Sequence, residues 1–140
     1  MRVFKAYGKP RGFDRSLREM TQAATAHLRA EIAIAEGRAD EALKAQAAAV
    51  TASRRADDNE PPILAAGARL ALGDLQLRAG RASEAEKTFR EDLVAQPGSG
   101  WARAGLTRAL RAQGRAADAQ ALQPQLAQAW VAADAALMTR

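Results

Sequence analysis

One six-residue sequence occurs three times in this chain of 140 residues, and each copy begins with glycine. The copies read GRADEA at residues 37–42, GRASEA at 80–85 and GRAADA at 114–119. Glycine readily takes the left-handed backbone conformation that ends many α-helices. The alanine five residues later leaves room for a paired helix to come close. We therefore interpret each copy as the inner turn of a helical hairpin, with a solvated arginine and with Asp40 or Ser83 as an N-cap or first-turn residue.

The composition favours helices along the whole chain. About a quarter of the residues are alanine, and Leu, Arg, Glu and Gln are also frequent, all of which have high helix propensity. The strand-forming residues Tyr, Phe, Ile and Val are scarce. A chain of this length corresponds to one domain. We expect an all-α domain with an interior of leucine and alanine.

Apolar spacing predicts six helices around these turns. The first spans Asp14 to Glu36, and six apolar residues at spacings of three and four lie on one of its faces: Leu17, Met20, Ala24, Leu28, Ile32 and Ala35. The other expected helices span 39–55 (or 40–55), 63–79, 83–95, 101–113 and a last one from about 117. Pro124 interrupts the last helix because proline cannot donate the backbone hydrogen bond. Residues 56–62, ADDNEPP, form a connector.

The positive charge lies mainly in an N-terminal arm. Residues 1–15 contain five Lys or Arg residues against Asp14 alone, a net charge of +4 of the formal +5. We expect residues 1–13 to be a flexible basic arm, followed by a repeat domain over 14–140. A nucleic-acid-binding domain would carry its basic patch on the folded body, so we expect no nucleic-acid partner. No segment has the length and apolarity of a membrane span.

The repeat has a recognisable period. Gly80 and Gly114 are 34 residues apart, which is the period of the tetratricopeptide repeat (TPR), a helix–turn–helix unit. Residues 66–99 resemble this family closely. The matching positions are Leu72 and Gly73 in the first helix, Gly80 in the turn, and Ala85, Phe89, Leu93 and Pro97 in and after the second helix.

The other two units resemble the family less closely. Residues 100–133 keep Leu106, Leu110, Gly114 and Ala119, but Thr107 and Gln123 stand where glycine and an aromatic residue are usual. The first unit keeps Gly37 and Ala42 but has Arg29 where leucine is expected. The resemblance implies an α-solenoid of about three antiparallel helix pairs, in a right-handed superhelix, with hairpins at about 14–55, 62–96 and 100–136.

A narrower resemblance concerns the whole repeat region. The order of NEPP, a repeat, FREDLVAQPGSGWARAGLTRALRAQGR and a late tryptophan is similar to the C-terminal part of larger bacterial TPR-repeat proteins. As given, the chain shows no signal peptide, so a soluble cytoplasmic protein is expected. A fragment of a longer relative would be periplasmic or exported.

The resemblance implies a concave groove lined by the first helix of each pair. The family's inward positions fall on His27, Glu31, Leu70, Asp74, Leu77, Arg78, Trp101, Arg108 and Arg111. Trp101 is alternatively a packing residue between units. Because arginine forks bind carboxylates bidentately, and Asp74 can orient one of them, we expect a peptide ligand with acidic residues.

The sequence contains no arrangement typical of an enzyme or a cofactor site. Cysteine is absent, and His27 is the single histidine, which we expect to pair with Glu31 at the protein surface. The acidic residues Asp57, Asp58 and Glu60 indicate a solvated connector. The first hypothesis is a non-enzymatic scaffold that binds a peptide or protein segment. The second is a module that packs on further repeats or self-associates, which would expose an apolar face on an end helix.

Overall fold

The computed structural model describes residues 13–56 and 63–138, and every regular element in these ranges is an α-helix. In chain order the helices are α1 (Phe13–Ala35), α2 (Ala39–Ala56), α3 (Ile63–Arg78), α4 (Ala82–Ala95), α5 (Gly100–Ala112), α6 (Ala116–Ala121) and α7 (Gln123–Met138). The expected bounds of the first five helices lie within one residue of the observed ones. The all-α prediction is confirmed for the described residues, whereas most of the predicted arm and the acidic connector lie outside them.

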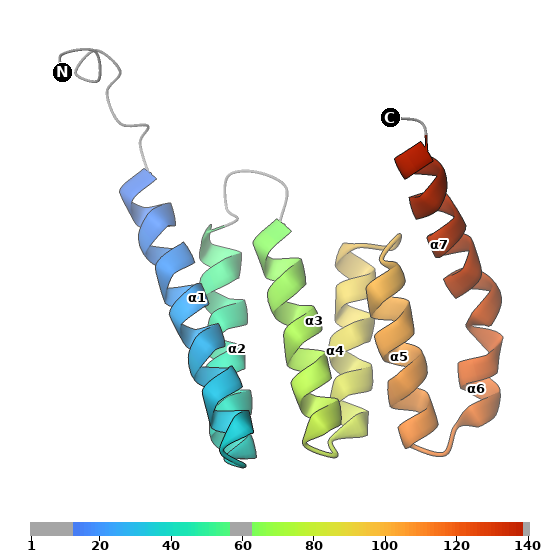
Figure 1. Ribbon diagram of the computed structural model, residues 1–140, viewed down its shortest axis with the longest axis horizontal. Coiled ribbons are helices and arrows are strands. Elements are labelled where there is room, and N and C mark those ends of the chain that lie inside the picture. Colours follow the sequence, from blue (N-terminus) through green and yellow to red (C-terminus); the bar gives the residue numbers. More distant parts are fainter. Residues whose placement is uncertain (1–12, 57–62, 139–140) are drawn as a thin grey trace.

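The helices stand in pairs that follow one another along the molecule (Figure 1). Helix α1 packs against α2, α3 against α4, and α5 against α6 and α7. Neighbouring pairs meet where α2 packs against α3 and where α4 packs against α5. In Figure 1 the helices α1, α3 and α5 lie in front of α2 and α4. We call the surface of these three helices that points away from α2 and α4 the α1–α3–α5 face.

The three repeated glycines end the first helix of each pair as the sequence predicts. Gly37, Gly80 and Gly114 have φ angles of 76°, 73° and 74°. At the second turn the Gly80 N–H donates to the Leu77 carbonyl at 3.0 Å, and the next N–H, of Arg81, donates to the Gln76 carbonyl at 2.8 Å. The same two bonds recur in the other two turns. This is the Schellman ending, in which a left-handed glycine satisfies the last carbonyls of a helix.

The alanine and the first-turn polar residue of the hexapeptide lie where the sequence predicts. The fifth residue after each glycine (Ala42, Ala85 and Ala119) is fully buried, as predicted. Ser83 is not an N-cap: that position in α4 belongs to Arg81, whose side chain makes no capping bond. Ser83 and Asp40 lie in the first turns of their helices.

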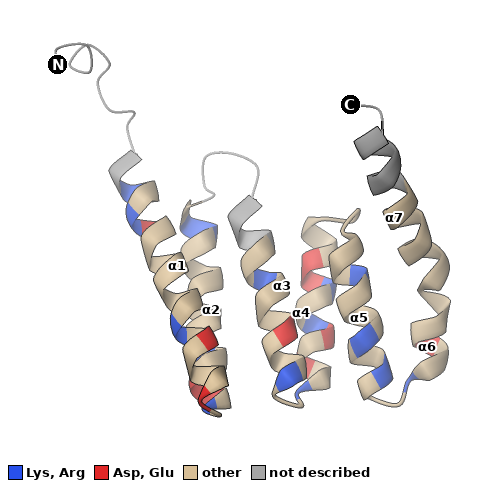
Figure 2. Cartoon of the chain, in the orientation of Figure 1, with Lys and Arg blue, Asp and Glu red and all other residues tan. Residues whose placement is uncertain are grey.

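The arginine of the hexapeptide is exposed but bound to carboxylates. Arg81 pairs with Asp40 in the preceding pair, and Arg115 Nη1 lies 2.8 Å from Glu86 Oε2 in α4. Acidic and basic residues therefore lie side by side at this end of the pairs (Figure 2). Glu86 also accepts hydrogen bonds from Gln113 Nε2 and Arg90. The bond from Gln113, with those from Arg90 and Arg115, holds the pKa of Glu86 below its ordinary value.

Phe89 fills the core between the second and third pairs. Its ring is 1% exposed and lies between Gly73 of α3 and Gly105 of α5. A Cβ atom on Gly73 would lie 2.5 Å from the ring, and one on Gly105 would lie 2.3 Å from it. Both distances are too short for non-bonded carbon atoms, so the ring fits because both residues are glycine. The resemblance indicated Gly73, but Gly105 becomes visible in the structure.

The apolar face predicted for the first helix is not its buried face. Ala30 and Ala33 are buried against the rest of the molecule, whereas four larger residues of the predicted face are about half exposed: Leu17, Met20, Leu28 and Ile32. Small side chains let α2 approach closely, which larger ones would prevent. Because alanines occur on every side of this helix, the spacing of apolar residues did not identify the side that packs.

The last pair is interrupted at Leu122. Helix α6 ends at Ala121 and α7 begins at Gln123, so that Pro124 falls in the first turn of a new helix. There its missing N–H leaves no helical bond unmade. The predicted interruption is confirmed, and it takes the form of a break between two helices.

Candidate functional site

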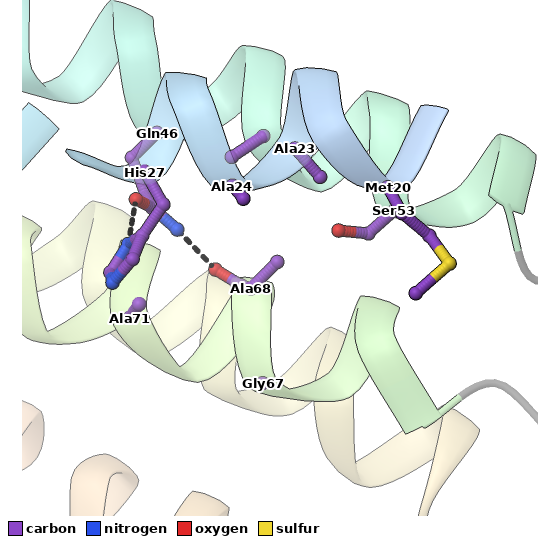
Figure 3. A pocket seen from close by; sticks show the side chains of 10 residues that line it. Met20, Ala23, Ala24, His27, Gln46, Ser53, Gly67, Ala68 and Ala71 are labelled. Carbon is purple, nitrogen blue, oxygen red and sulfur yellow. Dashed lines mark hydrogen bonds between the residues drawn. The ribbon is translucent and has the colours of Figure 1, made fainter. Parts of the chain in front are cut away.

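A cavity of about 420 Å³ opens on the α1–α3–α5 face between α1 and α3, and α2 forms its floor (Figure 3). Most of its wall is alanine and glycine. The lining residues are Met20, Ala23, Ala24 and His27 from α1, Gln46, Ala49 and Ser53 from α2, and Gly67, Ala68 and Ala71 from α3. The space exists because short side chains face each other across it. Its surface is mainly apolar, with few polar groups.

A chain of two hydrogen bonds crosses one end of the cavity. Gln46 is fully buried, and its Nε2 donates to the Ala68 carbonyl at 3.0 Å. Its Oε1 lies 2.9 Å from His27 Nδ1. A carbonyl can only accept, so the amide nitrogen faces Ala68 and the amide oxygen faces the histidine. Nδ1 of His27 must therefore carry the hydrogen, and in the neutral ring Nε2 is then an acceptor. Figure 3 shows both bonds.

The expected surface pair of His27 with Glu31 is not what the structure shows. Histidine bonds to Gln46 of α2, and Glu31 Oε2 lies 3.5 Å from Arg78 Nη1 of α3. A second pair of the same kind joins Asp74 of α3 to Arg108 of α5 at 2.6 Å. Both pairs connect first helices of neighbouring hairpins. Two of the three arginines expected to attract an acidic ligand are thus already bound to carboxylates.

The other predicted groove residues lie along the same face. Leu70 and Leu77 are half-buried against the core around Phe89. Trp101 is 68% exposed and meets the Trp130 ring of α7 edge-on, with the ring centroids 5.0 Å apart. The ring contact lies within the third pair, whereas the packing expected for Trp101 was between units.

Arg111 differs from the other arginines predicted for the groove. It is exposed on α5, and within the described ranges no carboxylate lies at ion-pair distance from it. The structure thus brings His27 to the cavity and spreads the remaining predicted residues over the three first helices.

The cavity has a signal in the sequence that appears when the three pairs are aligned on their turn glycines. Counting back 13 residues from each turn glycine reaches Ala24, Gly67 and Trp101. A small residue in the first two pairs leaves space where the third pair has a tryptophan. This comparison depends on the register of the three pairs, which the turns fix. Helical periodicity within a single helix carries no such information.

The described residues form neither a metal site nor a membrane-spanning helix. They contain no group of three or more His, Cys, Asp or Glu side chains arranged to hold a metal ion. None of their helices is both long and apolar enough to cross a membrane.

No family model, curated protein or solved structure matches this chain.

Proposed function

We propose that this protein is a non-enzymatic TPR-like scaffold that binds a peptide or protein segment on its α1–α3–α5 face. In this proposal the helix pairs form a short α-solenoid with the right-handed superhelical order of that family, and the face is its concave groove. The observation that carries the proposal is the apolar cavity between α1 and α3. Its volume of about 420 Å³ falls within the usual range of pockets that hold ligands, roughly 300–1,000 Å³.

The lining of the cavity indicates what it would accept. Alanine and glycine walls offer apolar surface without filling the space, so that inserted apolar side chains would leave water. Nε2 of His27 is an acceptor at the edge, and a hydroxyl or amide N–H of the ligand can donate to it. The proposed ligand therefore carries an apolar residue beside a hydrogen-bond donor.

The structure gives less support for an acidic ligand than the sequence does, because two of the three groove arginines are already paired. Glu31 and Asp74 already neutralise Arg78 and Arg108. Arg111 is the position on this face that supports an additional carboxylate. We propose that an acidic residue of the ligand lies over α5, and that its contribution weakens as salt screens the exposed charge.

Filling the cavity tests this function. A Cβ atom on Gly67 would meet no atom within 4 Å, so Gly67→Leu should place its side chain in the cavity without disturbing the fold. Peptides selected from a random displayed library would be synthesised and titrated calorimetrically against wild type and variant. We expect at least about a tenfold loss of affinity in Gly67→Leu, the effect of one lost apolar anchor.

The matched control adds the same side chain elsewhere. Glu91 is exposed on α4, and Glu91→Leu should bind the selected peptides as wild type does. If the peptides bind Gly67→Leu with unchanged affinity, the cavity is not the binding site.

A second candidate function is packing on further repeats or self-association. One observation favours it, because Leu28 and Ile32 are exposed on α1, the helix at one end of the row of pairs. Sedimentation velocity of wild type and Ile32→Lys distinguishes this candidate. A dimer that the substitution converts to monomer would support self-association through α1.

A further inference from the structure

Helices α1, α3 and α5 are the first helices of their pairs, and equivalent positions on them differ in burial. Counting back 12, 8 and 5 residues from each turn glycine gives one side of each helix. On α3 and α5 these positions hold apolar residues that are wholly or partly buried, whereas on α1 they are exposed and mostly polar. The sets are Ala68, Leu72 and Leu75 on α3, Ala102, Leu106 and Ala109 on α5, and Thr25, Arg29 and Ile32 on α1.

The fold itself shows what covers this side of a first helix. On α3 it is α2, whose Gln46 bonds to the Ala68 carbonyl and whose Leu43 packs in the cluster of Leu75. On α5 it is α4, whose Phe89 ring lies against Gly105. In both cases an amphipathic second helix from the preceding pair occupies the place. On α1 the equivalent side is open in the described structure.

A shallow furrow continues this open side between α1 and α2. It has a volume of about 340 Å³ and is lined by Gln22, Ala26, Ala48, Thr51, Ala52 and Arg55. We call the furrow, together with the exposed residues Leu28, Arg29, Ile32 and Lys44 beside it, the end face. Lys44 belongs to it because it lies one turn before Ala48 on the same side of α2.

The end face has unmatched positive charge. Arg29, Lys44 and Arg55 are exposed, and no carboxylate of the described residues lies within ion-pair distance of them. The nearby Glu36 and Glu41 both bind Arg38 at the turn. Figure 2 shows basic residues along α1 and α2 and most of the acidic ones towards that turn, whereas Glu19 lies near the start of α1.

We propose that the end face is a docking site for an acidic amphipathic helix of a partner protein. The helix lies on α1 as α2 lies on α3, with its apolar edge over Leu28, Ile32 and the furrow. Its carboxylates meet Arg29, Lys44 and Arg55. A purely apolar helix would strip water from the Arg29 guanidinium without replacing its hydrogen bonds, which is costly. A second copy of α2 brings Lys44 and Arg55 of its own and is repelled by like charge. This surface is separate from the α1–α3 cavity, so the inference does not depend on the proposed function.

Two synthetic helical peptides test the site on the full chain. Both carry leucine at positions i, i+3, i+4 and i+7 over several turns, with blocked termini. Glutamate fills the other positions in one peptide, and lysine fills them in the other. We expect the glutamate peptide to bind in calorimetric titrations and the lysine peptide not to bind. Affinity for the glutamate peptide should fall as salt increases.

Charge-reversal variants locate the contact. Arg29→Glu/Arg55→Glu should weaken binding of the glutamate peptide by about tenfold or more, as expected when several attractive pairs become repulsive. Lys87→Glu/Val94→Glu is the control pair, because it adds negative charge at two exposed positions of α4, which belongs to neither proposed binding surface. It should bind as wild type does. Ile32→Lys should abolish binding, and Gly67→Leu, in the cavity, should not change it.

Three results would overturn the proposal. The two peptides could bind equally well, or the control pair could weaken binding as much as the end-face pair. Wild type could also sediment as a dimer that Ile32→Lys dissociates, which would make a second copy the occupant. If the Arg29→Glu/Arg55→Glu variant loses helical circular dichroism, Arg29→Gln/Arg55→Gln provides the same comparison without charge reversal. The expected loss of affinity is then smaller.

Discussion

The ring of Phe89 is held between two glycines from different helices, and this arrangement sets how closely α3, α4 and α5 approach. Neither glycine has room for a single added carbon atom. Packing around the Phe89 ring therefore requires that both positions lack a side chain. A single substitution of either glycine would disrupt it.

We predict that Gly105→Ala destabilises the protein by about 1–3 kcal/mol, because an added methyl group over-packs the contact with Phe89. Urea unfolding followed by circular dichroism measures the change. Gly67→Ala is the control, since its Cβ meets open space and alanine favours a helix over glycine by roughly 0.5–1 kcal/mol. A Gly105→Ala protein as stable as wild type would contradict the contact.

Gly80 supports a second prediction at this scale. Its φ angle of 73° lies in a region that a β-branched residue rarely adopts. We expect Gly80→Val to lower the free energy of unfolding by more than about 1 kcal/mol. Gly80→Asn should lose less, because asparagine tolerates the left-handed conformation better than valine. Equal melting curves for valine and wild type would rule out a strained turn.

At the scale of elements, polar contacts join helices in addition to the apolar clusters. The buried Arg69 and Asp92 link α3 to α4, with Nε and Oδ1 2.9 Å apart. Glu86 links α4 to the α5–α6 turn through Gln113 and Arg115. These contacts involve residues 23 to 29 positions apart in the chain. They set the register between helices, and a pattern within one helix does not reveal them.

The lowered pKa of Glu86 gives this contact a pH dependence. Glutamate in an unfolded chain has a pKa of about 4.3. The pKa of Glu86 in the folded protein is lower, because its hydrogen bonds favour the charged form. Its contribution to stability is therefore present above about pH 4.3 and lost as the pH falls through the folded pKa. We predict that wild type is more stable than Glu86→Gln at neutral pH and that the difference shrinks on acidification.

Urea unfolding at a series of pH values measures this difference. Glu91→Gln, an exposed residue of the same helix, serves as the reference for a simple change of charge. A gap between wild type and Glu86→Gln that stays constant from neutral to acidic pH would show that Glu86 does not act through its ionised form.

For the whole molecule, the features that the sequence predicts are those that depend on residues close together in the chain. Each turn follows from a glycine and its neighbours, so the first five helices and their ends could be found in the sequence. The packing side of α1 could not, because its buried surface is alanine and its exposed surface holds Leu28 and Ile32. The cavity results from small residues on separate helices, and it requires the register between pairs. Of the candidate site, the sequence indicates His27 but not its bond to Gln46, which lies 19 positions away on another helix.

Another prediction concerns residues 1–13, of which only Phe13 lies within the described helices. They carry turn residues and most of the net charge, so we expect their deletion to leave the cooperativity of thermal unfolding unchanged. The helical signal per residue should stay equal or increase. A broad or low-temperature transition in the shortened protein would show that Phe4 and Phe13 contribute to the folded core.

The gap between α1 and α3 also determines which helix separates most easily from the rest of the molecule. Helix α1 rests on α2, while α3 and α5 each have neighbours on more than one side. Local opening costs least where few packed surfaces separate. The amide hydrogens of α1 should therefore exchange with solvent before those of α4, which lies between two helices. A ligand that bridges the gap would slow this exchange, so occupancy of the cavity would be visible as protection of a helix that fluctuates in the free protein.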